Sequence, residues 1–416
     1  MLVNPLAAPP EIAWQFQDAD VGAVFTTRAL SARLPGHAAS QVPVVLLDEA
    51  PRRAMVMVDG RAIEVDLGSH RGLALEGDPA THGRDEPCVI VYTSAMSGRS
   101  RGAVLTHRNL VANGRSTVVA ASMTNGDHAL AMLPFSHLFG LTVSASAPLL
   151  AGGRVTTMER FHPVKALDII ERHGVTQLVG VPAVFAALVQ AMERRGGTFG
   201  SHALRVCICG GAVLPVSLQD RFAELTGVEL RQGYGLTEAA PVVLFNRPPA
   251  ANVRGTLGVP FPDVEVSIRH PRTNEPAPQG TAGEICVRGD SVFAGYVNGA
   301  EDGLQMVDGW LHSGDEGVEN PDGSISFLQL LKAMFTRNGF NIYPRELERV
   351  IGAMPGVEAV RVYAIPDPLR ENDIGVEVHG AVTETAIKDW CDAQLSAYKQ
   401  PAVIKVAFRA TAETET

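Results

Sequence analysis

Residues 92–104 read Tyr-Thr-Ser-Ala-Met-Ser-Gly-Arg-Ser-Arg-Gly-Ala-Val and are the most informative stretch of the chain. The apolar, β-rich residues 88–93 come before them, and Thr106 follows as a plausible N-cap of a helical pattern. The stretch holds hydroxyl groups, glycines and the cations Arg99 and Arg101, which are the donors that a polyphosphate needs. It therefore predicts a phosphate-binding loop between a strand and a helix.

This loop lacks the spacing G-x-x-x-x-G-K-[ST], so it is not a Walker loop. A Ser- and Gly-rich turn after a strand is also common as a plain surface loop, so further motifs are needed to assign a nucleotide site. The residues expected to contact phosphate are Thr93, Ser94, Ser97 and Gly98.

Length and charge narrow the class of protein. A chain of 416 residues suits one large domain and a smaller one. Its net charge is −10 and it has no Lys- or Arg-rich run, which argues against nucleic acid or an anionic membrane as partner. The apolar stretch at residues 178–192 is interrupted by Gly180 and Pro182, so no membrane span is expected. The odd count of five cysteines favours reduced thiols in a cytoplasmic protein.

Helical and strand patterns alternate along the chain. Helices are expected at residues 10–19, 167–173 and 183–194, and strands at residues 21–26, 42–47, 175–179 and 203–209. Frequent prolines between short strand-like runs mark residues 255–296 as a β-rich subdomain, and a compact α/β segment follows Asp315. The pattern predicts an α/β fold, with a large layered N-terminal domain, a β-rich subdomain and a small α+β C-terminal domain.

Five further motifs follow the loop in a fixed order. They are Leu-Pro-Phe-Ser-His-Leu-Phe-Gly at 133–140, Cys-Gly-Gly-Ala-Val-Leu-Pro at 209–215, Gly-Tyr-Gly-Leu-Thr-Glu at 233–238, Gly-Trp-Leu-His-Ser-Gly-Asp at 309–315 and Asn-Gly-Phe-Asn-Ile-Tyr-Pro-Arg-Glu-Leu-Glu at 338–348. Together with the loop, they resemble the adenylate-forming superfamily of acyl-CoA synthetases, luciferases and peptide-synthetase adenylation domains. The resemblance extends over most of the chain.

The resemblance implies an AMP-forming, ATP-dependent ligase. Such an enzyme joins a carboxylate, or another small oxyanion, to the α-phosphate of ATP and then passes the acyl group to a thiol or an amine. The expected cofactors are ATP or AMP and Mg²⁺, with coenzyme A as a candidate thiol. By the same resemblance, Glu238 is the Mg²⁺ ligand, and the catalytic candidates are Glu238, His137, Lys332 and Arg101.

The remaining site residues also follow from the resemblance. Asp315 is expected to accept both ribose hydroxyls, and Tyr234 to lie against the adenine. Taken alone, Asp315 also fits a turn before a strand, and His137 a satisfied core histidine. The nucleotide-binding candidates are Thr93, Ser94, Ser97, Gly98, Gly210, Gly211, Ala212, Tyr234, Gly235, Thr237 and Asp315, and those of the substrate and thiol path are Val181 and Gly339.

The resemblance also divides the chain. Residues 1–331 match the large AMP-binding domain, with the usual opening segment expected to be absent. Residues 332–416 match the small mobile domain, with the hinge near Lys332 and an end expected before the family's usual catalytic lysine.

Several residues depart from the family pattern. Ala95 and Met96 stand where Gly and Thr are usual, and Arg101 stands for a lysine. Leu330 replaces an arginine that reaches the nucleotide, and Ala333 replaces an acid. Two alternatives to an active ligase follow, namely a weakly active or non-catalytic binder of AMP, acyl-adenylate or acyl-thioester, and one half of a split ligase. A homo-oligomer is a further expectation, and the sequence does not identify the acid.

Overall fold

The computed structural model describes residues 1–35, 42–47, 53–58, 61–66, 83–93, 100–197, 199–299, 304–331, 334–367 and 369–407. Four of the expected site residues, Ser94, Ser97, Gly98 and Lys332, lie outside these ranges. The same holds for the departures at Ala95, Met96 and Ala333.

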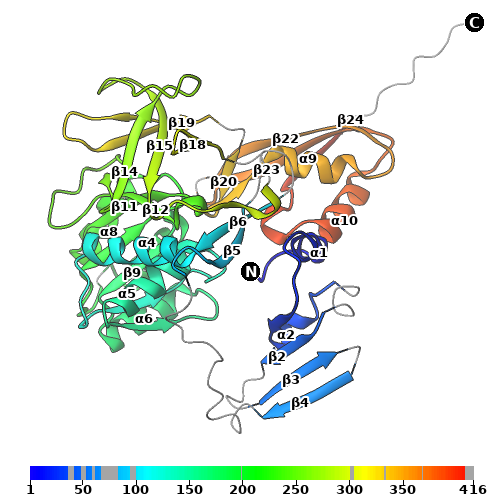
Figure 1. Ribbon diagram of the computed structural model, residues 1–416, viewed down its shortest axis with the longest axis horizontal. Helices are drawn as coiled ribbons and strands as arrows, with labels where there is room; N and C mark the ends of the chain where they lie inside the picture. Colours follow the sequence, from blue (N-terminus) through cyan, green and yellow to red (C-terminus); the bar gives the residue numbers. More distant parts are fainter. Residues whose placement is uncertain are drawn as a thin grey trace, which may run out of the picture.

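A seven-stranded sheet forms the centre of the large part of the molecule (Figure 1). The neighbours β8, β7, β9, β10 and β11 are parallel, and β12 and β13 continue the sheet in antiparallel pairing. Several of these strands are buried along their whole length, which is typical of a sheet covered on both faces. The strands are β7 (His128–Ala131), β8 (Arg154–Thr157), β9 (Gln177–Gly180), β10 (Val206–Cys209), β11 (Leu230–Gly235), β12 (Val242–Phe245) and β13 (Val259–Pro260).

Helices cover the two faces of this sheet. Alternate residues of β10 show the division, because Ile208 belongs to one hydrophobic cluster and Cys207 to the other. The cluster around Cys207 includes side chains of α6 (Pro163–His173), α7 (Pro182–Arg194) and α8 (Val216–Thr226). The cluster around Ile208 includes side chains of α4 (His107–Ala120), the π-helical turn η2 (Phe139–Ser146) and α5 (Ala147–Leu150).

The strand β5 (Pro87–Thr93) pairs with β6 (Arg101–Thr106), and β16 (Gly295–Tyr296) pairs with β6. The prediction of a loop that runs from a strand directly into a helix is therefore wrong, because residues 101–106 form a second strand before α4. The buried side chains of Ala103 and Leu105 explain this, since they pack into the core from β6. The predicted N-cap is confirmed, as the hydroxyl oxygen of Thr106 accepts a hydrogen bond from the Asn109 amide at 3.3 Å.

A second sheet confirms the predicted β-rich region and extends it. Its main order is β14, β15, β18 and β17, and β19 pairs with β18. The strands are β14 (Val264–Arg269), β15 (Gly283–Gly289), β17 (Met306–Val307), β18 (Trp310–Glu319) and β19 (Ile325–Leu330).

The start of the chain forms a small layer of its own secondary structure. The helix α1 (Pro9–Asp18) buries Ile12 and Phe16 in a cluster with neighbouring residues of the first 34. A four-stranded sheet in the order β1, β2, β3, β4 follows (Figure 1). Its elements are β1 (Val24–Thr26), the short α2 (Arg28–Ser31), β2 (Val44–Leu47), β3 (Arg53–Val58) and β4 (Arg61–Asp66).

The C-terminal segment has its own hydrophobic cluster, built from residues between Phe335 and Val406. A hairpin, β20 (Phe335–Arg337) and β21 (Phe340–Ile342), precedes α9 (Pro344–Gly352). The strands β22 (Val357–Asp367), β23 (Glu371–Gly380) and β24 (Val403–Ala407) form one sheet, and α10 (Glu384–Gln394) packs with them. We call residues 334–407 the C-terminal unit. The predicted domain boundary at residue 332 falls outside the described residues, and the division stays a prediction.

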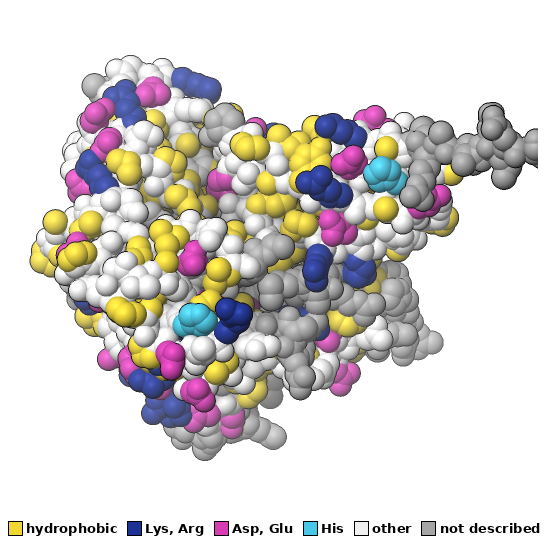
Figure 2. Space-filling view, turned by 90° about the horizontal axis from the view of Figure 1, so that it is seen from above, with side chains coloured by type: hydrophobic (Ala, Val, Ile, Leu, Met, Phe, Trp, Pro, Cys, Tyr) yellow, Lys and Arg dark blue, Asp and Glu magenta, His cyan; other side chains and the backbone are white. Residues whose placement is uncertain are grey.

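These elements confirm the predicted α/β fold class. The cysteines are free, and all except Cys88 are buried. On the face shown in Figure 2, Lys and Arg side chains lie interspersed with Asp and Glu side chains. Within the part of the chain that the structure describes, no helix is both long and apolar enough to cross a membrane.

Candidate active site

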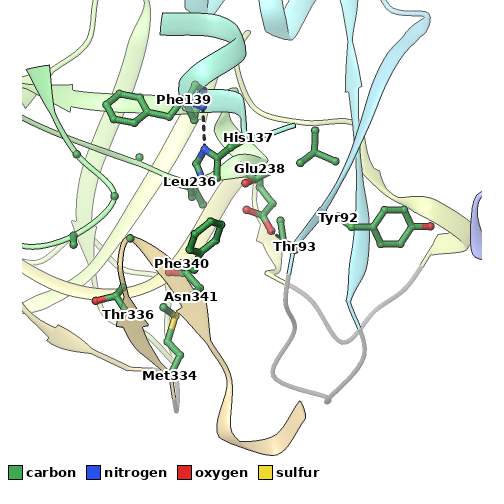
Figure 3. A pocket seen from close by; sticks show the side chains of 18 of the residues that line it. Tyr92, Thr93, His137, Phe139, Leu236, Glu238, Met334, Thr336, Phe340 and Asn341 are labelled. Carbon is green, nitrogen blue, oxygen red and sulfur yellow. Dashed lines mark hydrogen bonds between the residues drawn. The ribbon is translucent and has the colours of Figure 1, made fainter. Parts of the chain in front are cut away.

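A cavity of about 510 Å³ lies at the carboxyl ends of β10 and β11, between the large sheet and the hairpin β20–β21 (Figure 3). In open α/β sheets this edge is where ligands usually bind. Side chains from most of the predicted motifs converge here, and the C-terminal unit supplies Met334, Thr336, Phe340 and Asn341.

Glu238 is a buried carboxylate on the wall of this cavity. Its Oε1 accepts a hydrogen bond from the Tyr296 hydroxyl at 2.7 Å. It accepts another from the Thr93 hydroxyl at 3.4 Å, and Figure 3 shows Thr93 next to Glu238. Burial, and then the charge of Glu238, raise the pKa of Tyr296, so its hydroxyl remains protonated and donates. The carboxylate is held by hydroxyl groups and has no cation among these partners.

Asp315 and Tyr234 form a second polar pair in the cavity. The Tyr234 hydroxyl donates to Oδ2 of Asp315 at 2.6 Å, and burial together with that carboxylate raises the pKa of Tyr234. Asp315 is buried within β18, so the alternative of a turn aspartate is wrong.

A hydrogen-bond network that the sequence analysis did not identify supports the strand that carries Asp315. Glu284 accepts from the Gly314 amide and contacts Nδ1 of His312, each at 2.7 Å. With Cys286, these side chains offer ligand atoms within 4.8 Å of one another. Both carboxylate oxygens of Glu284 already have partners, which fits a role in fixing the strand next to Asp315. His312 lies inside the motif at 309–315, and this position in the sequence could have identified it as a residue near the site.

His137 lines the cavity two residues before the π-helical turn η2. Its Nδ1 accepts a hydrogen bond from the Phe139 amide at 3.2 Å (Figure 3). The ring is exposed to the cavity but surrounded by protein, and this desolvation lowers the pKa of His137. A neutral ring that accepts at Nδ1 carries its proton on Nε2.

Two glycines keep the inner wall of the cavity open. A Cβ at Gly210 would stand 3.2 Å from Cζ of Phe139, and one at Gly235 only 1.9 Å from the carbonyl oxygen of Pro241. Larger residues at these positions would displace the aromatic ring or the backbone.

The residues of the predicted thiol path meet where the hairpin β20–β21 approaches the large sheet. Gly339 has a φ of +75°, and a Cβ there would stand 2.7 Å from Cγ1 of Val181. A Cβ at Gly211 would stand 3.3 Å from the same methyl group. Hairpin β20–β21 therefore closes against the large sheet at a point where only glycine fits.

The structure brings most of the expected site residues together. Those that line the cavity are Thr93, Arg101, His137, Gly210, Gly211, Ala212, Tyr234, Gly235, Thr237, Glu238, Asp315 and Gly339. Val181 contacts this wall through Gly211 and Gly339. Leu330 also lines the cavity, and the sequence analysis missed Tyr296, Phe340, Glu11 and Lys399. The individual roles of these residues stay predictions.

Comparison with known proteins agrees with this geometry. Residues 1–297 match the family described as AMP-binding enzyme. A feruloyl-CoA synthase from Amycolatopsis sp is 33% identical over 413 residues, which cover 96% of this chain and 83% of that protein.

Solved structures give the same result. A malonyl-CoA ligase in a ternary product complex with methylmalonyl-CoA and AMP has a TM-score of 0.80 at 25% identity, covering 98% of this chain and 84% of that chain. The amide bond synthetase McbA from Marinactinospora thermotolerans also has a TM-score of 0.80 at 25% identity, covering 97% of this chain and 80% of that chain.

Proposed function

Because the chain belongs to the family of AMP-binding enzymes, we propose that it is an AMP-forming, ATP-dependent acid–thiol ligase whose acceptor is coenzyme A. In the first step a carboxylate oxygen attacks the α-phosphorus of ATP and pyrophosphate leaves. In the second, the thiol sulfur attacks the acyl carbon and AMP leaves. The observation that carries the proposal is one cavity where Glu238, Asp315 and His137 of the large part face the hairpin β20–β21.

The nucleotide would lie along Tyr234 and Asp315. A carboxylate has about four acceptor sites, so Asp315 can accept ribose hydroxyls in addition to the Tyr234 hydroxyl. The aromatic ring of Tyr234 offers an apolar face to the adenine. We call Glu238, Asp315 and Tyr234 the nucleotide side of the cavity.

Glu238 and Thr93 fit a magnesium ion, because both present oxygen atoms on the cavity wall and magnesium prefers such ligands. When bound, Mg²⁺ would neutralise charge on the phosphates of ATP. The hydroxyl of Tyr296 keeps the Glu238 carboxylate in place without adding a competing cation.

His137 would hold the substrate carboxylate. Because Nδ1 accepts from the Phe139 amide, the neutral ring has Nε2–H left to donate to a substrate oxygen. The lowered pKa of His137 favours the neutral ring, and the hydrogen bond from the Phe139 amide selects the tautomer with its proton on Nε2.

The acid we propose is an aromatic propenoic acid of the ferulate type. The feruloyl-CoA synthase similarity supports this class. So does the inner wall, where Phe139 lies beside Gly210 and offers an aromatic surface to the cavity.

An amine is the second candidate acceptor, supported by the similarity to the amide bond synthetase McbA. Coenzyme A is preferred because the 33% identical relative and the malonyl-CoA ligase are both named for CoA thioesters. Since these relatives are ligases, the alternative of a non-catalytic binder is not favoured. We further propose that the enzyme acts in the cytoplasm, where ATP and coenzyme A are supplied.

The test is to incubate the full chain with ATP, MgCl₂, coenzyme A and, in separate reactions, ferulate, malonate or palmitate. Mass spectrometry of products and a pyrophosphate assay should find feruloyl-CoA and AMP in equal amounts, with the other acids slower. Omitting MgCl₂ should abolish pyrophosphate release. Amide formation with an added amine, in place of thioester, would select the second acceptor. Absence of AMP formation with every acid would overturn the proposal.

A further inference from the structure

A buried ionic cluster joins the start of the chain to its end. The ammonium nitrogen of Lys399 lies 2.6 Å from Oε1 of Glu11 and 2.7 Å from Oε1 of Glu346. The three side chains are only 4%, 15% and 6% exposed. The Ser396 hydroxyl donates to the other Glu11 oxygen and accepts from the Ala8 amide at 3.3 Å.

The two ion pairs of Lys399 differ in what they connect. Glu346 lies on α9 and Lys399 in the short turn η5 (Ala397–Lys399), so that pair is internal to the C-terminal unit. Glu11 lies on α1, which is next to α10 in Figure 1, so its pair with Lys399 crosses to another part of the molecule.

The helix α1 is attached on its other side to the strands that flank the predicted phosphate loop. The Tyr92 hydroxyl donates to Asp18 at 2.7 Å, and the Trp14 indole donates to the Ser100 carbonyl at 3.2 Å. At the start of the chain, the Leu2 amide donates to the Ile90 carbonyl at 3.0 Å. One helix thus contacts β5, the residue that precedes β6, and the C-terminal unit.

The orientation of the C-terminal unit determines the position of hairpin β20–β21. In this structure Gly339 of the hairpin packs on Val181 and lines the cavity. Separating Lys399 from Glu11 would leave a buried carboxylate without its cation, which is unfavourable. The ion pair therefore favours the arrangement in which Gly339 closes the cavity.

We propose that Glu11 and Lys399 are positioning residues for acyl transfer to the acceptor, and that their ion pair holds the C-terminal unit in the orientation that places Gly339 against Val181. In its catalytic part this inference rests on the proposed function. In the step concerned, the bond between sulfur and the acyl carbon forms, the bond between that carbon and the AMP oxygen breaks, and the thiol proton passes to solvent.

The variant Glu11→Gln tests the pair while leaving the internal pair between Lys399 and Glu346 intact. Transfer is measured alone, by mixing enzyme with preformed feruloyl-adenylate and coenzyme A in a single turnover. We expect a rate at least tenfold lower than wild type, with ATP–pyrophosphate exchange within twofold of wild type. Asp389→Asn, an exposed acid on α10, is the matched control and should match wild type in both.

A second measurement does not depend on activity. Hydrogen exchange followed by mass spectrometry should show residues 335–342 exchanging at least fivefold faster in Glu11→Gln, with α9 unchanged. Lys399→Met should have the same effect on the hairpin, and the exposed Lys405→Met should have none. Unchanged hairpin exchange in Glu11→Gln would overturn the inference, as would an equal fall in transfer and pyrophosphate exchange. If the wild type does not use feruloyl-adenylate, the proposed function fails, and hydrogen exchange alone decides on the ion pair.

Discussion

Two parts of the cavity wall are built in different ways. On the nucleotide side, buried carboxylates are fixed by short hydrogen bonds, such as those of Asp315 to Tyr234 and of Glu238 to Tyr296. Where the hairpin β20–β21 approaches the large sheet, at what we call the acceptor side (Val181 and Gly339), the contact is a close approach of a glycine to one methyl group.

This difference means that the nucleotide side depends on hydrogen bonds within the large part of the molecule, whereas the acceptor side depends on how the C-terminal unit is placed. The nucleotide side is held inside the large part of the molecule, where Glu284 and His312 also brace the strand of Asp315. The acceptor side exists only while the C-terminal unit is in place. Substitutions on the nucleotide side should therefore impair adenylation, and those on the acceptor side should spare it and slow transfer.

The largest effect is expected from Glu238→Gln. Glutamine retains partners for Tyr296 and Thr93 but loses the charge that would face Mg²⁺ and the phosphates. We expect pyrophosphate release to fall about a thousandfold, or about 4 kcal/mol of transition-state stabilisation. Thermal unfolding of the variant serves as the control and should be close to wild type. A loss of rate below about tenfold would contradict the predicted role of this residue.

Asp315→Asn comes next. The amide keeps one acceptor oxygen, so it can satisfy Tyr234 or a ribose hydroxyl but is a poorer acceptor for both. We expect AMP affinity, measured by calorimetry, to weaken about thirtyfold, or about 2 kcal/mol. Tyr234→Phe, which keeps the ring and loses only the hydroxyl, should lose less. Equal AMP affinity in Asp315→Asn and wild type would place the ribose elsewhere.

The sequence predicted helix ends well, because they depend on residues that are close together in the chain. The N-cap at Thr106 and the helix that ends at Gly174, which has a φ of +62°, follow from short-range backbone chemistry. The strand β6 was missed because its Ser- and Gly-rich start suggests a loop, whereas burial of Ala103 and Leu105 makes it a strand.

Most of the predicted site residues that the structure describes line the cavity, but the motifs did not predict the contacts that support them. Lys399 and Glu11 are separated by 388 positions, and no periodicity in a single sequence reports such a pair. The brace between Glu284 and His312 joins residues 28 positions apart across two strands, and it depends on strand register. The predicted roles of side chains came from the resemblance to a family. The contacts that position those side chains could be seen only in the folded structure.

Gly339→Ala tests whether the acceptor side affects acyl transfer separately from adenylation. A Cβ there would stand 2.7 Å from Val181, and the φ of +75° disfavours a side chain by about 1 kcal/mol. We expect acyl transfer to slow about tenfold while ATP–pyrophosphate exchange stays near the wild-type rate. Val181→Ala combined with Gly339→Ala should recover part of the transfer rate, because it removes the colliding methyl groups. Equal losses in both half-reactions would show that the two sides are not separable.

The smallest effect is expected from a substitution on the nucleotide side that should increase ATP affinity rather than reduce it. Leu330 lines the cavity and lies opposite Asp315 in the pairing of β18 with β19. In the family that the chain resembles, an arginine that reaches the nucleotide stands here.

Leu330→Arg would add a cation that can meet a phosphate, and exposed charge pairs of this kind contribute up to about 1 kcal/mol. We expect ATP to bind about fivefold more tightly, measured by calorimetry with Mg²⁺ present. Leu331→Arg is the matched control, because its side chain is 43% exposed and does not line the cavity. Tighter binding in both variants would reflect net charge alone, whereas tighter binding only in Leu330→Arg would show that position 330 faces the phosphates.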